Sequence, residues 1–148
     1  MNTKLIVVAD LGLLRAYKLS RDDTDPRPRL ELVDEVELKE AHHRVTDMVS
    51  DQAGRFASSA HPGASAGERH NIELEHRKRL IKQLADHVAV LLRREHVETC
   101  YLAASKEINH KILDLLPHDV RAKITKNIAA DLTKLGKAEL LERFAAEP

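Results

Sequence analysis

Hydrophobic positions follow a strand-like rhythm in the first part of the chain. Residues 5–9 form a continuous apolar run, and after Asp10 and Gly12 a second run at residues 13–19 alternates loosely. This pattern predicts an antiparallel hairpin closed by a short glycine turn. A polar break at residues 20–29 leads to apolar positions at 30, 32, 36 and 38, set among acids. We expect a third strand there, with one face toward a core.

The second half of the chain changes to helical spacing. Apolar residues fall at steps of three and four over one long stretch, which predicts a helix from about residue 72 to residue 95. These residues are Leu80, Ile81, Leu84, Val88, Leu91 and Leu92. A buried strand at 97–104 follows, then a helix that Pro117 stops. The remaining pattern predicts a short helix or turn at 118–122, a strand at 124–129 and a final helix at 137–146.

The predicted elements follow the order β-β-β-α-β-α-β-α. Strands separated by helices pair in parallel, whereas hairpins pair antiparallel, so the order indicates a mixed five-stranded sheet with helices on its faces. We therefore predict an α/β fold of three layers in the ribonuclease H-like arrangement. The length of 148 residues matches one domain. With no linker or repeat in the chain, residues 1–148 are expected to form that single domain.

One long polar segment, residues 40–71, interrupts this pattern. It contains Gly54, Gly63 and Gly67, the pair Ser58-Ser59, and several arginines and histidines. Glycine and proline disfavour regular structure, and a connection of this length inside a small domain is usually functional or disordered. The segment is therefore predicted to be a loop that makes contact with a partner.

Composition excludes several classes of protein. The 24 Lys and Arg residues balance 24 Asp and Glu, so no global charge favours nucleic acid or an anionic membrane. The apolar run at the start is too short for a signal peptide or a membrane span, which predicts a cytoplasmic protein that does not contact the membrane. Cys100 is the only cysteine and is expected in the core. No cofactor is predicted, and the pattern indicates no oligomeric state.

Asp10 is the single catalytic candidate. In ribonuclease H-like nucleases several carboxylates hold two metal ions, and one of them projects from the first strand, where Asp10 stands. The strand at 97–104 ends in Ala103-Ala104-Ser105 and supplies no second carboxylate. We therefore interpret Asp10 as a turn residue. A degenerate metal-dependent nuclease or hydrolase is the alternative function.

Histidines near the start of the long helix suggest a metal site only weakly. Glu73 and His76 have the three-residue spacing of a carboxylate-histidine ligand pair, and His70 lies close by. A single pair of this kind is common by chance. Solvated histidines are the preferred interpretation, and no metal site is predicted.

The same region carries a basic cluster. Asn71 is a plausible helix cap after Arg69 and His70, and Arg77, Lys78 and Lys82 follow in the first turns. Backbone donors, the helix dipole and these basic side chains would together suit a phosphate. The cluster, with Arg55 from the loop, is the predicted binding site for an RNA backbone or another partner. Nearby glutamates leave a merely solvated helix face as the competing interpretation.

Several segments together resemble the bacterial host attachment proteins, described as proteins required for attachment to host cells. They are LIVVADLGLLRAYKL, VSDQAGR, AGERHN, the His76-Arg77 pair, LAASKEINHKILDLL and DLTKLGKAELLERF. That family is similar in fold to the central domain of archaeal and eukaryotic class 1 release factors. The resemblance implies a link to RNA or the ribosome, and the family name implies a protein-interaction module that affects adhesion indirectly.

Release factors present a Gly-Gly-Gln tip from the loop before their long helix. The corresponding loop here contains Asp51-Gln52-Ala53-Gly54 and Ala66-Gly67-Glu68. Because that chemistry depends on a particular backbone presentation, peptide release is not transferred to Gln52. The resemblance therefore favours a non-catalytic module that binds RNA, the ribosome or a protein.

Overall fold

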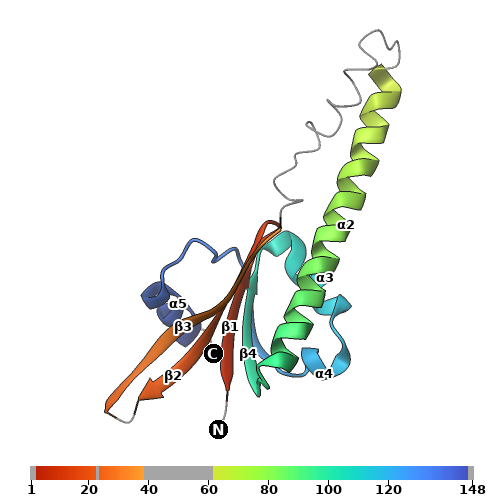
Figure 1. Cartoon of the computed structure of the whole chain (residues 1–148). Coiled ribbons are helices and arrows are strands. Elements are labelled where there is room, and N and C mark those ends of the chain that lie inside the picture. Colours follow the sequence, from red (N-terminus) through yellow and green to blue (C-terminus); the bar gives the residue numbers. More distant parts are fainter. Residues whose placement is uncertain (1–2, 23, 39–61, 147–148) are drawn as a thin grey trace.

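A mixed five-stranded sheet forms the centre of the protein (Figure 1). A computed structural model describes residues 3–22, 24–38 and 62–146. The strands are β1 (Lys4–Ala9), β2 (Leu13–Asp22), β3 (Asp25–Glu37), β4 (Thr99–Ala104) and β5 (Ile124–Ala129), in the spatial order β3-β2-β1-β4-β5. β1 pairs in parallel with β4, and β4 with β5, whereas β2 is antiparallel to both β1 and β3. The predicted hairpin and the mixed five-stranded sheet of an α/β protein are confirmed.

Helices cover both faces of this sheet. They are α2 (Pro62–Arg94), α3 (Lys106–Leu115), α4 (His118–Arg121) and α5 (Lys137–Ala146). α2, α3 and α4 lie on one face, and α5 lies on the other (Figure 1). The observed order is β1-β2-β3-α2-β4-α3-α4-β5-α5, in which α4 is the segment predicted as a short helix or turn at 118–122 and left out of the predicted order.

Two hydrophobic clusters occupy the two faces of the sheet. Side chains alternate along β1, so Leu5, Val7 and Ala9 join the cluster beneath α2 and α3. Ile6 and Val8 join the cluster beneath α5. A central strand covered on both faces is apolar at every position, which explains the uninterrupted run at the start of the chain.

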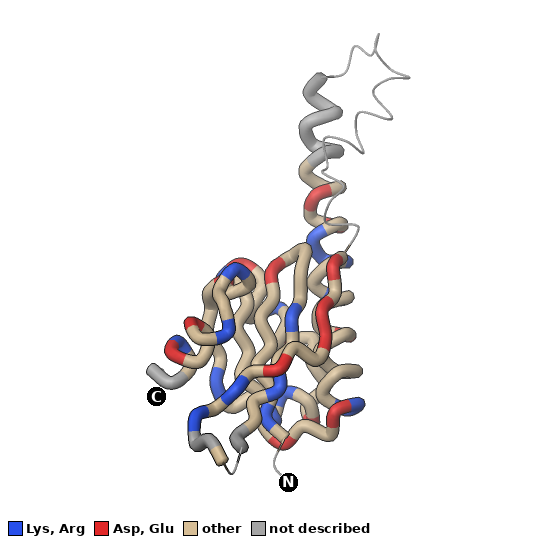
Figure 2. The backbone as a smooth tube through the Cα atoms, turned by 60° about the vertical axis from the view of Figure 1, so that its left-hand side comes forward, with Lys and Arg blue, Asp and Glu red and all other residues tan. Residues whose placement is uncertain are grey.

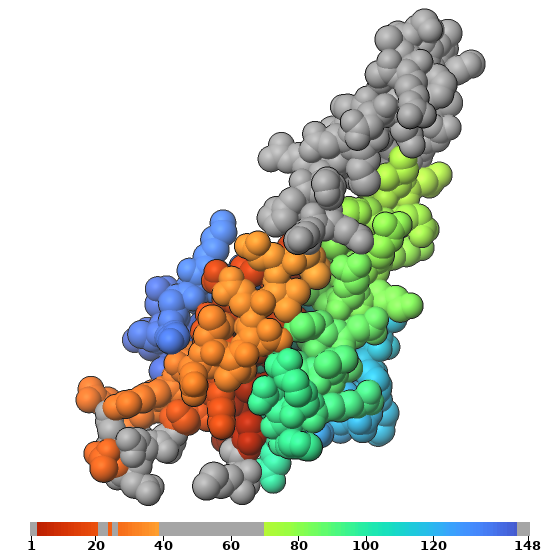
Figure 3. Space-filling view, viewed as in Figure 1, coloured from red at the N-terminus to blue at the C-terminus, as the bar shows by residue number. Residues whose placement is uncertain are grey.

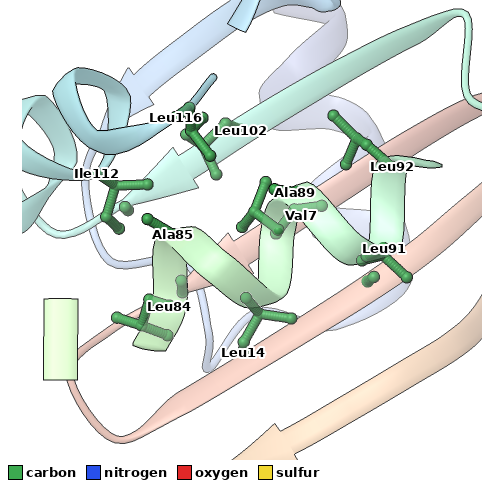
Figure 4. Packing of buried hydrophobic residues seen from close by; sticks show 14 of the residues in the cluster. Val7, Leu14, Leu84, Ala85, Ala89, Leu91, Leu92, Leu102, Ile112 and Leu116 are labelled. Atoms are coloured by element: carbon green, nitrogen blue, oxygen red, sulfur yellow. The ribbon is translucent and has the colours of Figure 1, made fainter. Parts of the chain in front are cut away.

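α2 packs on the sheet through the stripe predicted from its spacing (Figure 4). Leu84, Leu91 and Leu92 are almost completely buried, and Figure 4 shows them among Val7 and Leu14 of the hairpin and Ala85 and Ala89 of α2 itself. The six apolar residues of the predicted stripe are all buried. The helical interpretation of this stretch is confirmed.

The polar break predicted at residues 20–29 is mostly strand. β2 continues to Asp22 and β3 already begins at Asp25. β3 contains Pro26 and Pro28, and proline cannot donate a backbone hydrogen bond. β3 lies at the edge of the sheet, where strands tolerate proline. Its position, which the local sequence does not show, explains the difference.

α2 begins at Pro62, about ten residues before the predicted start. The cap predicted at Asn71 is therefore wrong, because Asn71 lies inside the helix. Proline is favoured in the first turn, where its missing N–H costs nothing. Gly63 and Gly67 each cost about 1 kcal/mol relative to alanine, but a helix already nucleated by packing extends at little expense. The rest of the predicted loop, residues 40–61, lies outside the described residues.

Candidate functional site

The first half of α2 extends beyond the sheet (Figure 1). Among the α2 side chains that the structure describes, which begin at His70, burial starts at Leu80. Between Asn71 and Arg79 the side chains are exposed except Ile72 and His76, which are half-buried. In the space-filling view, the green surface of α2 continues past the orange surface of β3 (Figure 3). We call residues 62–79 the projecting half of α2 and residues 80–94 the packed half.

The predicted binding residues are distributed unevenly over this helix. His70, Arg77, Lys78 and Lys82 lie on α2 with exposed side chains. Arg69 lies in α2, but its side chain is outside the described part of the chain, as is the whole of Arg55. Since residues 69–72 are internal to α2, their backbone N–H groups are not the free donors of a first turn, and the predicted anion site loses that component.

Helical geometry separates the basic side chains from one another. Arg77 lies three residues before Leu80, so it continues the buried stripe past the edge of the sheet. Lys78 and Lys82 are one turn apart on the flank of α2 that faces α3. Figure 2 shows acidic and then basic residues along the part of the projecting half that is not drawn in grey. Lys78 Nζ also lies 3.7 Å from Glu75 Oε1. The charge of this region is therefore mixed.

A groove runs between α2 and α3 and brings a third lysine to Lys78 and Lys82. Its volume is about 410 Å³. We call it the α2/α3 groove. It is lined by Lys78, Ile81, Lys82, Lys111, Asp114 and Leu115. Lys111 and Leu115 were not among the predicted site residues, because only the packing of α3 beside α2 places them there. The sequence offers only one signal for this groove, namely that both predicted helices carry lysines among their polar residues.

Asp10 forms the turn between β1 and β2. Its Oδ1 accepts hydrogen bonds from the backbone N–H groups of Gly12 and Leu13, both at 2.8 Å. Its other oxygen, Oδ2, lies 3.4 Å from the hydroxyl of Thr133. Thr133 in turn donates to Asp131 Oδ1 at 2.6 Å. The two hydrogen bonds to Oδ1 confirm the interpretation of Asp10 as a turn residue. Oδ2 links the hairpin to the segment after β5.

This turn lies at the carboxyl end of β1, the edge at which α/β sheets commonly hold ligands. Arg15 also reaches this edge, where its Nη1 donates to the carbonyl oxygen of Thr133 at 2.7 Å and its Nε lies 3.5 Å from Glu35. Asn109 and Asn127 exchange two hydrogen bonds of 2.7 Å nearby in the fold, between α3 and β5. The polar groups at this edge therefore bind one another.

The weak metal candidates His70, Glu73 and His76 lie on the projecting half of α2. His76 is half-buried and the other two side chains are exposed. Within the residues that the structure describes, His, Cys, Asp and Glu side chains nowhere gather in a group of three or more that would suit a metal ion. The three residues thus lie on one helix, and among the described residues they do not form a metal site.

Cys100 lies in β4 beneath α2 and is fully buried. Burial raises the pKa of its thiol to about 12, because an apolar environment disfavours the thiolate. At neutral pH the side chain is a neutral core residue, as the sequence predicted.

Polar contacts fix the packed half of α2 at its outer positions. His87 Nε2 lies 2.8 Å from Asp34 Oδ2 of β3, and Arg94 lies 3.6 Å from the same oxygen. Near the end of the helix, Arg93 contacts Asp119 of α4 at 3.1 Å. This hydrogen bond, with the charge of Arg93, holds the pKa of Asp119 below its usual value. None of these pairs is visible in the sequence, because each joins distant segments.

The fold defines the chain as an α/β protein with a mixed five-stranded sheet and one helix that extends well past it. A model of one protein family matches residues 5–144. The chain belongs to this family, which is described as protein required for attachment to host cells.

No curated protein matches the chain. Among the described residues, no helix combines the length and the apolar character needed to cross a membrane.

Proposed function

We propose that this protein is a non-catalytic binding module that contacts RNA, alone or on the ribosome, through α2. The observation that carries the proposal is the projecting half of this helix. It has no buried side chain between Asn71 and Arg79, so packing against its own sheet does not explain its presence. A helix that extends from a packed domain instead offers side chains for contact.

Charge supports RNA as the ligand. Between Asn71 and Lys82 the chain has four Lys and Arg residues against two Glu. Arg77, Lys78 and Lys82 are exposed and can reach phosphate oxygens, which attract cations regardless of base sequence. The strand and helix order supports the ribonuclease H-like arrangement assigned from the sequence, and with it the likeness to release factors. The proposed role places the protein in the cytoplasm.

The nuclease alternative has less support. It needs Asp10 as a metal ligand, but Oδ1 of that carboxylate already accepts two backbone hydrogen bonds. A carboxylate oxygen that accepts two hydrogen bonds from the backbone of a turn stabilises that turn, which favours a structural role for Asp10.

Binding to a labelled oligouridine RNA and to purified ribosomes tests the proposal. We expect binding at about 50 mM salt that weakens steeply toward about 200 mM, because bound phosphates release counterions. Arg77→Ala with Lys78→Ala should weaken binding and reduce the slope of log affinity against log salt by about 1.4 for a single strand. Lys137→Ala on α5, an exposed lysine on the opposite face, is the matched control. Absence of binding to both probes at low salt would refute the proposal.

A further inference from the structure

The α2/α3 groove has an apolar floor that RNA phosphates do not explain. Ile81 lies at its base and is only 3% exposed, whereas Leu115 at the end of α3 is 54% exposed. A single exposed leucine is ordinary on a protein surface. Here, however, it borders a groove of about 410 Å³ beside a second aliphatic side chain. Such a groove suits an apolar side chain of another molecule.

The rim of the groove is positive. Lys82 and Lys111 form no ion pair with any residue in the described part of the chain. Lys78 pairs with Glu75, but both side chains are about 70% exposed, so an incoming acid can replace this contact at little cost. The only acid in the lining, Asp114, already has His110 at 3.4 Å and Arg121 at 4.0 Å.

We propose that the α2/α3 groove binds an acidic, amphipathic helical segment of a partner protein. Apolar residues of that segment would lie against Ile81 and Leu115, and its Asp or Glu side chains would pair with Lys78, Lys82 and Lys111. Lys78 and Lys82 stand one turn apart, about 6 Å along the helix axis, the same spacing as two acids four residues apart on a helix laid alongside. This inference goes beyond the RNA proposal and does not require it.

Selection of phage-displayed random dodecapeptides on the full chain tests this inference. We expect the enriched peptides to be rich in Asp and Glu and to carry apolar residues three and four positions apart. Binding of these peptides should perturb the amide NMR signals of the protein residues Ile81, Lys82, Lys111 and Leu115. Leu115→Ser should weaken the selected peptides at least about tenfold, as expected when an apolar anchor is lost. Lys82→Glu with Lys111→Glu should abolish their binding.

Matched controls use side chains outside the groove. Val90 is 59% exposed on α2 but does not line the groove, so Val90→Ser should leave peptide affinity unchanged. Lys137→Glu on α5 provides the same control for charge. All these positions except Ile81 are exposed, so the variants should fold, and circular dichroism checks that they do.

Three results would overturn the inference. The first is a selection that enriches no acidic amphipathic peptide. The second is a set of peptides that bind the Leu115→Ser and lysine variants as well as the original chain. The third is a shift of the Leu115 signal on α3 by oligouridine alone, which would make the apolar part of the groove a nucleic-acid surface. The RNA proposal is tested separately. It fails if the chain does not bind RNA, or if Arg77→Ala with Lys78→Ala leaves RNA binding unchanged.

Discussion

The two halves of α2 form one continuous helix, but they differ in the burial of their side chains. The packed half places Leu84, Val88 and Leu92 against the sheet, where burial of apolar surface stabilises it. The projecting half is exposed on almost every side from Asn71 to Arg79. Among the described side chains of α2, burial against the sheet is confined to the packed half, and the exposed turns before it are stabilised by helix propagation from it. The difference separates the residues that stabilise the fold from those whose side chains stay exposed.

Thiol reactivity should separate the halves by the largest factor. Cys100 lies beneath the packed half, and burial raises its thiol pKa from 9.0 to about 12. A cysteine placed on the projecting half by Leu74→Cys, in a Cys100→Ala background, should have an ordinary pKa. At about pH 8 the thiolate fraction of Cys100 is then roughly a thousandfold smaller, and burial also blocks access to its sulfur, so a disulfide reagent should label it far more slowly. Equal labelling rates in the folded protein would contradict the packing of α2.

Core truncation should show the same contrast in stability. Leu84→Ala removes a side chain that is 1% exposed and should lower the free energy of unfolding by about 2–5 kcal/mol through the cavity it leaves. Leu74→Ala is the matched substitution on the projecting half, at a side chain 43% exposed, and should change it by less than about 0.5 kcal/mol. Urea denaturation measures both. A similar loss for the two variants would mean that residues 62–79 are packed after all.

Polar contacts provide the smallest test of the comparison. Asp34→Ala removes the carboxylate that contacts His87 and Arg94 of the packed half, and should cost about 1 kcal/mol because that side chain is only 19% exposed. Glu75→Ala removes an exposed pair from the projecting half and should cost less than about 0.5 kcal/mol. Thermal unfolding at low salt compares the two variants. A larger effect of Glu75→Ala would reverse our assignment of the halves.

The sequence predicted the parts of the protein that are stabilised by periodic burial. β1, the stripe of α2 and the buried position of Cys100 follow from the spacing of apolar residues alone. The start of α2 was placed too late, because residues 62–71 contain no apolar stripe and two glycines. Their helical state depends on the packed turns that follow them, which a local pattern does not contain.

The candidate site was predicted only in part for a related reason. Arg77, Lys78 and Lys82 were identified from their clustering along the chain, but helical geometry places Arg77 on a different side from the two lysines. Lys111 and Leu115 became relevant only because α3 packs beside α2. The roles of Asp34 and Thr133 likewise depend on contacts between segments far apart in sequence.

The prolines of β3 have a consequence for how copies of this protein meet. An edge strand exposes unpaired backbone groups to which the strand of another molecule can add, the first step toward aggregation. Pro26 and Pro28 lack the N–H that such an addition needs, and Arg27 and Arg29 place charge beside them. This stretch of the sheet is thereby protected from growing by recruitment of further strands. The protein can expose a long helix while this part of its sheet resists polymerisation.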